Sequence, residues 1–135
     1  MSNYKYFRDE EIKNLDLEFV AMLDNARHVS GVPYTITSGY RTPEENFEVG
    51  GVDASAHTKG LAVDLRCQDT HHLGLILKGL YAVGFNRIGI YFANKDNKPW
   101  PSHVHVDNAK DRVQDVVWLK LEGHRDIDAI EAFVL

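Results

Sequence analysis

Cysteine is almost absent from this chain, and so is any long apolar run. The single cysteine, Cys67, excludes an internal disulfide and any metal site built from several cysteines. No stretch approaches the ~20 consecutive apolar residues that cross a bilayer, and residues 1–10 lack the apolar segment of a signal peptide. We therefore expect no stable membrane insertion, synthesis in the cytoplasm, and no export by the usual signal.

Positive charge is also scarce. The chain has 15 Lys and Arg against 20 Asp and Glu, a formal net charge of −5, and it contains no long basic run. This balance disfavours a nucleic-acid partner held by a broad basic surface. With cysteine scarce, a bound metal ion would have to be held by carboxylates and by the seven histidines.

The chain has no repeat, low-complexity tract or flexible linker, so we predict a single domain over residues 1–135. Hydrophobic periodicity and turn residues predict helices and strands in an irregular order, which favours an α+β fold, an antiparallel sheet flanked by helices. The predicted helices are 14–29, 44–49, 70–84 and 126–133; the predicted strands are 34–38, 61–65, 87–92, 103–107 and 116–121, with a polar loop at 94–98.

Two of the predicted strands carry polar residues that need an explanation. Asp64 interrupts an apolar strand, and a buried carboxylate requires a cation or strong donors. Pairing with Arg66, Arg87 or backbone amides is the structural alternative. In the second strand, His103, His105 and Asp107 alternate with valines and therefore share one face. An exposed strand face that happens to carry histidines is the alternative there.

A third element, His57, precedes Asp64 by seven positions, with Gly60 allowing a tight turn between them. Together with the distant His105, these residues offer two imidazoles and one carboxylate. Three such ligands suit a catalytic zinc ion, which keeps a fourth position for water. A structural zinc site would more often be closed by four ligands, frequently cysteines.

Three segments, in this order, carry a family resemblance: residues 37–43 (TSGYRTP), 55–64 (SAHTKGLAVD) and 102–107 (SHVHVD). They resemble the zinc D-alanyl-D-alanine carboxypeptidase family, which includes phage L-alanyl-D-glutamate endolysins and shares its fold with the hedgehog signalling domain. The resemblance covers about residues 7–118. It implies a hedgehog-type fold and a Zn²⁺-dependent peptidoglycan peptidase.

Carried over by motif, the resemblance makes His57, Asp64 and His105 the zinc ligands. His103 then corresponds to the histidine that acts on the water or the tetrahedral intermediate, and Arg41 to the arginine that reaches the substrate carbonyl.

Two further positions are expected to contact substrate or backbone: Ser55, beside the first ligand, and Tyr40 in the arginine motif. Many family members carry a glutamate three residues before the last ligand, whereas this chain has Ser102. The assignment of the base therefore rests on His103. For Arg41, a surface ion pair with Glu44 or Glu45 is the alternative.

The resemblance implies hydrolysis of a D-amino-acid-containing bond in a peptidoglycan stem peptide, either a terminal D-Ala or an L-Ala–D-Glu bond. The expected role is that of a phage endolysin acting at the cell wall or periplasm. The alternative is a non-catalytic zinc-bearing binding or tail-structural domain on the same scaffold. Tyr91, Trp100 and Trp118 are candidates for a substrate groove or for the core.

Several polar residues and the cysteine are expected to have other roles. We expect His28, His71 and His72 to be solvated near helix ends and Cys67 to be buried. Asp107 is either an acceptor that orients a histidine or an exposed acid.

Overall fold

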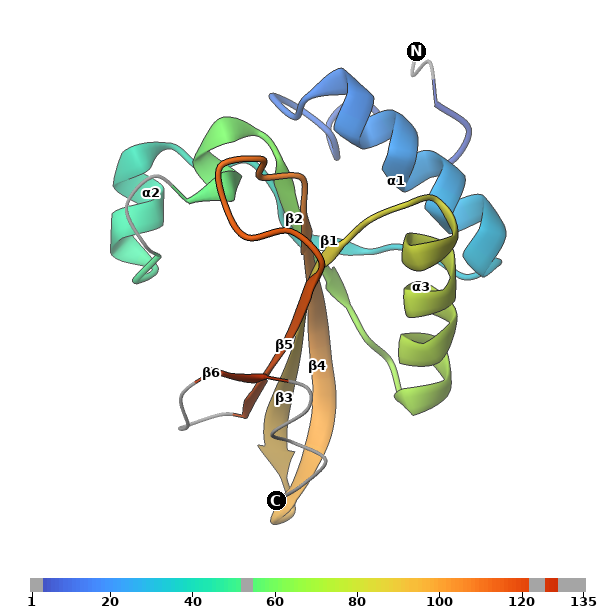
Figure 1. Ribbon diagram of the computed structural model, residues 1–135, viewed down its shortest axis with the longest axis vertical. Helices are drawn as coiled ribbons and strands as arrows, with labels where there is room; N and C mark the ends of the chain where they lie inside the picture. Colours follow the sequence, from blue (N-terminus) through green and yellow to red (C-terminus); the bar gives the residue numbers. More distant parts are fainter. Residues whose placement is uncertain (1–3, 52–54, 122–125, 129–135) are drawn as a thin grey trace.

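The computed structural model describes residues 4–51, 55–121 and 126–128. Along the chain, the elements are α1 (Leu17–Ser30), β1 (Ile36–Ser38), α2 (Pro43–Glu48), a 3₁₀ helix (Ala56–Lys59), β2 (Ala62–Arg66), α3 (Thr70–Ala82), β3 (Arg87–Lys95), β4 (Lys98–Asp107), β5 (Val116–Leu121) and β6 (Asp126–Asp128). The described strands form a sheet in the order β1-β2-β4-β3-β5-β6. Figure 1 shows α1 and α3 on one side of this sheet and α2 on the other. The predicted α+β class is confirmed.

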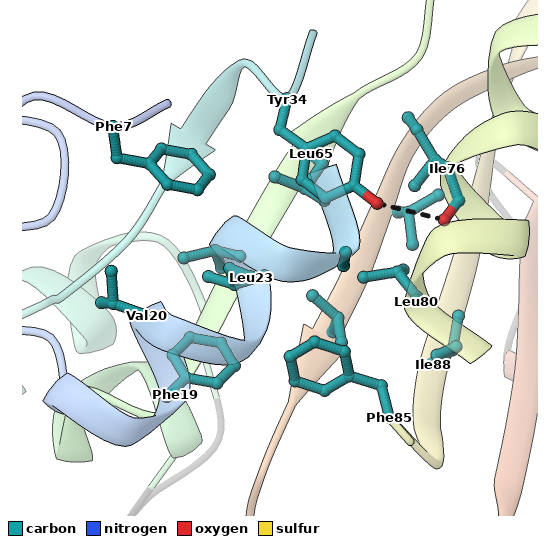
Figure 2. Close-up of a cluster of buried hydrophobic side chains, with 14 of the residues drawn as sticks. Phe7, Phe19, Val20, Leu23, Tyr34, Leu65, Ile76, Leu80, Phe85 and Ile88 are labelled. Carbon is teal, nitrogen blue, oxygen red and sulfur yellow. Dashed lines mark hydrogen bonds between the residues drawn. The ribbon is translucent and has the colours of Figure 1, made fainter. Parts of the chain in front are cut away.

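Side-chain alternation gives the sheet one apolar face and one polar face. On β4, Val104 and Val106 are fully buried in the core, whereas His103 and His105 line a cleft on the opposite face. The core lies between the apolar face and the helices α1 and α3, as Figure 2 shows, and its largest members include Phe7, Phe19, Leu23, Tyr34, Leu65, Ile76, Leu80, Phe85 and Ile88. Burying one such side chain contributes about 1.5–3 kcal/mol. The core therefore holds the backbone from which the polar face projects.

The helices begin at side-chain caps that the sequence supplies. Asp16 accepts a hydrogen bond from the Phe19 amide, and Asp69 accepts one from the His72 amide, so each carboxylate satisfies a free N–H of its helix. Before α2, Thr42 and Glu45 form a reciprocal capping box. No helix within the described ranges is both long enough and apolar enough to traverse a bilayer.

Helices α1 and α3 approach so closely that one position between them must be glycine. A Cβ on Gly79 would lie 2.0 Å from Ser30 Oγ and 2.3 Å from the Ala26 carbonyl oxygen. Ser30 Oγ also hydrogen-bonds Tyr34 Oη at 2.6 Å, and Tyr34 donates to the Ile76 carbonyl, drawn as a dashed line in Figure 2. Burial raises the pKa of Tyr34 to about 12, so the phenol stays neutral and remains a donor.

The hairpin between β3 and β4 is longer than predicted. Residues 94–98 were expected to form a polar loop, but the strands stay paired up to Lys95 and Lys98. Asp96 and Asn97 both have positive φ, as in a two-residue hairpin turn. Prolines inside β4 are tolerated because residues 98–101 pair with β3 and lie beyond the end of the β2 ladder.

Two other expectations are corrected. The sheet is not wholly antiparallel, because β5 follows β4 in sequence and runs opposite to it but pairs beside β3, which makes the β3–β5 pair parallel. Residues 126–133 were predicted to be a helix, yet residues 126–128 form strand β6, paired antiparallel with β5. Pairing with a free edge overrides the weak helical periodicity there. Residues 129–133 lie outside the described part of the chain.

The contact at Gly79 yields a test with a control inside the same helix. Gly79→Ala should lower the free energy of unfolding by about 1–3 kcal/mol, because overpacking outweighs the gain in helix propensity. Gly74, where a Cβ would meet open space, is the control, and Gly74→Ala should stabilise by up to about 1 kcal/mol. Urea unfolding of both variants measures this, and equal effects would contradict the close packing of α1 and α3.

Candidate metal centre and catalytic site

His57 is fixed by the short 3₁₀ helix on the polar side of the sheet. Ser55 caps this helix by accepting a hydrogen bond from the His57 amide. Gly60 ends it with φ 71°, and a Cβ there would lie 2.5 Å from the Asn14 carbonyl oxygen, so the turn needs glycine both for conformation and for space. The His57 ring is 4% exposed, and its Nδ1 lies 2.8 Å from the Gly39 carbonyl oxygen. Because a carbonyl only accepts, Nδ1 donates to it, which leaves Nε2, the ring nitrogen facing Asp64, as the one that could bind an ion.

Asp64 and His105 are direct partners across the antiparallel pair β2–β4. His105 Nδ1 lies 3.1 Å and His57 Nε2 lies 3.5 Å from Asp64 Oδ1. One ligand atom from each of the three residues lies within 4.8 Å of the others. Tetrahedral ligands at about 2.0–2.1 Å from zinc are about 3.3–3.4 Å apart. The donor set and its spacing therefore fit a zinc ion with little rearrangement.

Opposite charges attract Asp64 and His105 to each other without a metal ion. Burial alone would raise the pKa of Asp64, but the hydrogen bonds with His105 and His57 outweigh it and hold that pKa well below its usual range. Burial would likewise lower the pKa of His105, yet its hydrogen bonds to Asp107 and Asp64 raise the pKa to about 9. Without a metal ion, His105 is thus an imidazolium at neutral pH, and its positive charge lies between the carboxylates of Asp64 and Asp107.

His103 lies on the same face as His105, one step back along β4. Its ring stacks on Tyr91, with 4.5 Å between centroids and 14° between planes, and its Nδ1 lies 3.1 Å from Ser102 Oγ. Burial lowers the pKa of His103, and His105, His57 and Arg41 lower it further against the opposing effect of Asp64. A neutral imidazole can accept a proton, which is what a general base at this position needs. Ser102, which replaces the family glutamate, contacts this ring.

Arg41 is held over the cluster by three contacts. Its guanidinium donates to Ser38 Oγ at 3.0 Å and Asn46 Oδ1 at 3.2 Å, and it lies 3.7 Å from Asp64 Oδ2. Asn46 fits because its neighbour Gly51 has no side chain, and a Cβ there would lie 2.1 Å from the amide oxygen. The proposed surface pairing with Glu44 or Glu45 is not what positions Arg41, since Glu45 caps α2 and Arg41 contacts Asp64. Asp64 thus lies beside His105 and Arg41, whereas Arg87, one of the two arginines expected to pair with it, pairs with Asp107 instead.

The other residues expected to contact substrate differ in whether they line the cleft. Ser55 lines the cleft beside His57, whereas Tyr40 is 36% exposed and is not part of the cleft lining. Tyr91 and Trp118 line the cleft; Trp100 does not, and instead lies under the ammonium group of Lys95.

The cleft over the polar face has a volume of about 620 Å³ and holds the metal cluster, His103 and Arg41. Trp118 lies across Gly89, where a Cβ would come within 2.4 Å of the indole, and its ring is 5.5 Å from that of His105. Apart from the histidines, the charged residues among the described lining of the cleft are Arg41, Arg87, Arg112, Lys120, Asp64 and Asp107. Within this described part of the lining, four Arg and Lys side chains face two carboxylates, although the whole chain has a formal net charge of −5.

Sequence reasoning did not find the contribution of Arg87, Arg112, Lys120 and Gly89 to this cleft. The sequence does indicate three of these positions. Side chains alternate between the two faces of a strand, so Arg87 and Gly89 share a face of β3 with Tyr91, and Lys120 shares a face of β5 with Trp118.

Two of the minor expectations are settled by burial. Cys67 is buried as expected, and burial raises the pKa of its thiol to about 11. His72, expected to be solvated, is 6% exposed; its two ring nitrogens lie 3.0 Å from the Gln68 amide and the Pro33 carbonyl. It therefore ties the start of α3 to the segment before β1.

Metal binding should release a proton from His105, because its pKa of about 9 keeps Nδ1 protonated at neutral pH. The apparent zinc affinity is therefore expected to rise about tenfold per pH unit between about pH 7 and 8.5 and to level off above about pH 9. Competition with a chromophoric chelator at each pH measures this slope. An affinity that does not change over this range would contradict the assigned ligand.

Comparison with known proteins bears on the same residues. The family model described as Peptidase M15 matches residues 6–107, which include Arg41, His57, Asp64, His103 and His105. No curated protein matched the chain. The match spans most of the sequence and confirms the resemblance to the zinc D-alanyl-D-alanine carboxypeptidase family, whose members depend on zinc. The chain belongs to the Peptidase M15 family.

Proposed function

We propose that this protein is a zinc-dependent peptidase that cleaves a bond next to a D-amino acid in the stem peptide of peptidoglycan. The observation that carries the proposal is the joint placement of three ligands, a neutral histidine and an arginine in one open cleft. Family membership supports the peptidase chemistry and a peptidoglycan target. The excess of Arg and Lys side chains among the described residues of the cleft suits stem peptides, which carry free carboxylates.

His57, Asp64 and His105 would hold the zinc ion. When bound, zinc supplies a Lewis acid that activates water and polarises the peptide carbonyl. His103 accepts the proton of the attacking water at its imidazole and returns it to the departing amine. Arg41 stabilises the negative charge that develops on the carbonyl oxygen, and its contacts to Ser38 and Asn46 fix the guanidinium before the substrate arrives.

Two further parts of the proposal are the peptide bond that is cut and the place where the protein acts. We propose two candidate bonds, the terminal D-Ala-D-Ala bond and the L-Ala–D-Glu bond, and a phage endolysin as the biological role. Because peptidoglycan lies outside the cytoplasmic membrane, this substrate implies action at the cell wall or periplasm.

Digestion of purified murein by zinc-loaded protein tests the proposal and identifies the bond. Released D-Ala indicates carboxypeptidase activity, whereas new amino termini on D-Glu indicate endopeptidase activity. His103→Ala should keep the metal and lose turnover, while Asp64→Ala should lose the metal, as measured by metal analysis of both variants. If the zinc-loaded protein releases neither product, the enzyme proposal fails and the non-catalytic zinc-bearing domain takes its place.

Arg41→Gln should lower kcat about 10²- to 10³-fold, the usual cost of removing a donor to the developing oxyanion. Zinc content should change little, because Arg41 is 3.7 Å from a carboxylate oxygen and is not a ligand. Arg8→Gln removes the same charge at an exposed position and is the control, with no expected change in rate. A loss in Arg41→Gln that comes entirely from reduced zinc content would contradict the assigned role.

A further inference from the structure

Asp107 lies behind a metal ligand. It follows His105 by two residues on the same face of β4, and its carboxylate is 2% exposed. Its Oδ2 lies 2.7 Å from His105 Nε2, the ring nitrogen that points away from Asp64. The family model ends at this residue, and the proposed catalytic steps make no use of it.

The other carboxylate oxygen of Asp107 is occupied by donors that cannot act as acceptors. Arg87 Nε donates to Oδ1 at 2.7 Å, and the Ala109 amide donates to the same atom at 3.0 Å. Arg87 is 8% exposed and also donates to the Val113 carbonyl, so its position is fixed from both sides. The carboxylate therefore cannot rotate without breaking two hydrogen bonds.

We propose that Asp107 is a positioning residue that fixes His105 as the tautomer with its proton on Nε2, so that the Nδ1 lone pair is kept for the zinc ion. The proposal rests on the metal centre of the proposed function. A carboxylate can only accept from His105 Nε2, so that nitrogen must carry a proton and cannot bind the ion. The Gly39 carbonyl has the opposite effect on His57, whose free nitrogen is Nε2. The two histidine ligands thus bind through different ring nitrogens.

Arg87 also determines the orientation that the amide group of an Asp107→Asn variant would adopt. In Asp107→Asn, the amide oxygen must take the Oδ1 place, where two N–H donors point at it. The NH₂ group is then left facing His105 Nε2 and donates to it. His105 would hold its proton on Nδ1, the nitrogen that should bind zinc. A change of one atom, with no change in volume, inverts the tautomer.

The zinc affinity of Asp107→Asn tests the proposal, measured by competition with a chromophoric chelator on folded protein. We expect a loss of at least about 10- to 100-fold, the usual effect of removing a group that orients a ligand. Asp111→Asn is the matched control, because it removes the same charge from an exposed acid that binds Lys59; it should stay within about twofold of the parent protein. A purely structural Asp107–Arg87 ion pair predicts lower stability with unchanged affinity per folded molecule, and that result would overturn the proposal.

A second measurement needs no variant and decides the question if Asp107→Asn does not fold. In the zinc-loaded parent protein with ¹⁵N-labelled histidine, the NMR spectrum should show a proton on His105 Nε2 and none on Nδ1. A proton on Nδ1 would overturn the proposal. If the parent protein binds zinc with this tautomer but does not hydrolyse murein, the positioning role of Asp107 is supported and the proposed peptidase activity fails. Failure of the parent protein to bind zinc would overturn both.

Discussion

The register between β2 and β4 assembles the metal centre. Asp64 faces His105 across the two strands, and the neighbouring pairs, Val63 with Val106 and Leu65 with Val104, turn to the opposite face. A shift of one residue would exchange the faces, burying imidazoles in the core and exposing valines. The valines and Leu65 are fully buried, and any other register would expose them at a cost in free energy. Their burial therefore fixes the positions of the ligands on the opposite face.

Much of the metal centre and of its place on the sheet could be predicted from the sequence, for physical reasons. The alternation of residues 103–107 fixes which side chains share a face, and the motifs carry the chemistry of His57, Asp64 and Arg41. What the sequence did not predict depends on pairing at a distance. The β3–β4 hairpin extends through Pro99 and Pro101 because that stretch lies beyond β2, and the parallel pairing of β3 with β5 depends on where the chain returns to the sheet. Neither is visible in local periodicity.

Residues at the site were missed for a similar reason. Gly89 looks like an ordinary strand interruption, yet its lack of a side chain lets Trp118 from β5 lie across β3 towards His105. For Arg87, the sequence suggests Asp64 as a partner, whereas the structure pairs it with Asp107, and the role of Asp107 depends on the register of β4 with its neighbours. The contact of Asp107 with His105 is a consequence of strand alternation, but the contact with Arg87 requires β3 beside β4. Tyr40 neighbours Arg41 in the motif but is not among the residues that line the cleft, so its contact with substrate stays a prediction.

The turn at Gly60 joins the ligand-bearing loop to the beginning of α1. The Asp16 amide donates to the Gly60 carbonyl at 2.8 Å, directly beside the carboxylate that starts that helix. This hydrogen bond forms only when the 3₁₀ turn that carries His57 and the start of α1 are both in place. The first candidate ligand is therefore joined to the N-terminal helix through the backbone, so that a side chain added at Gly60 would disturb both elements.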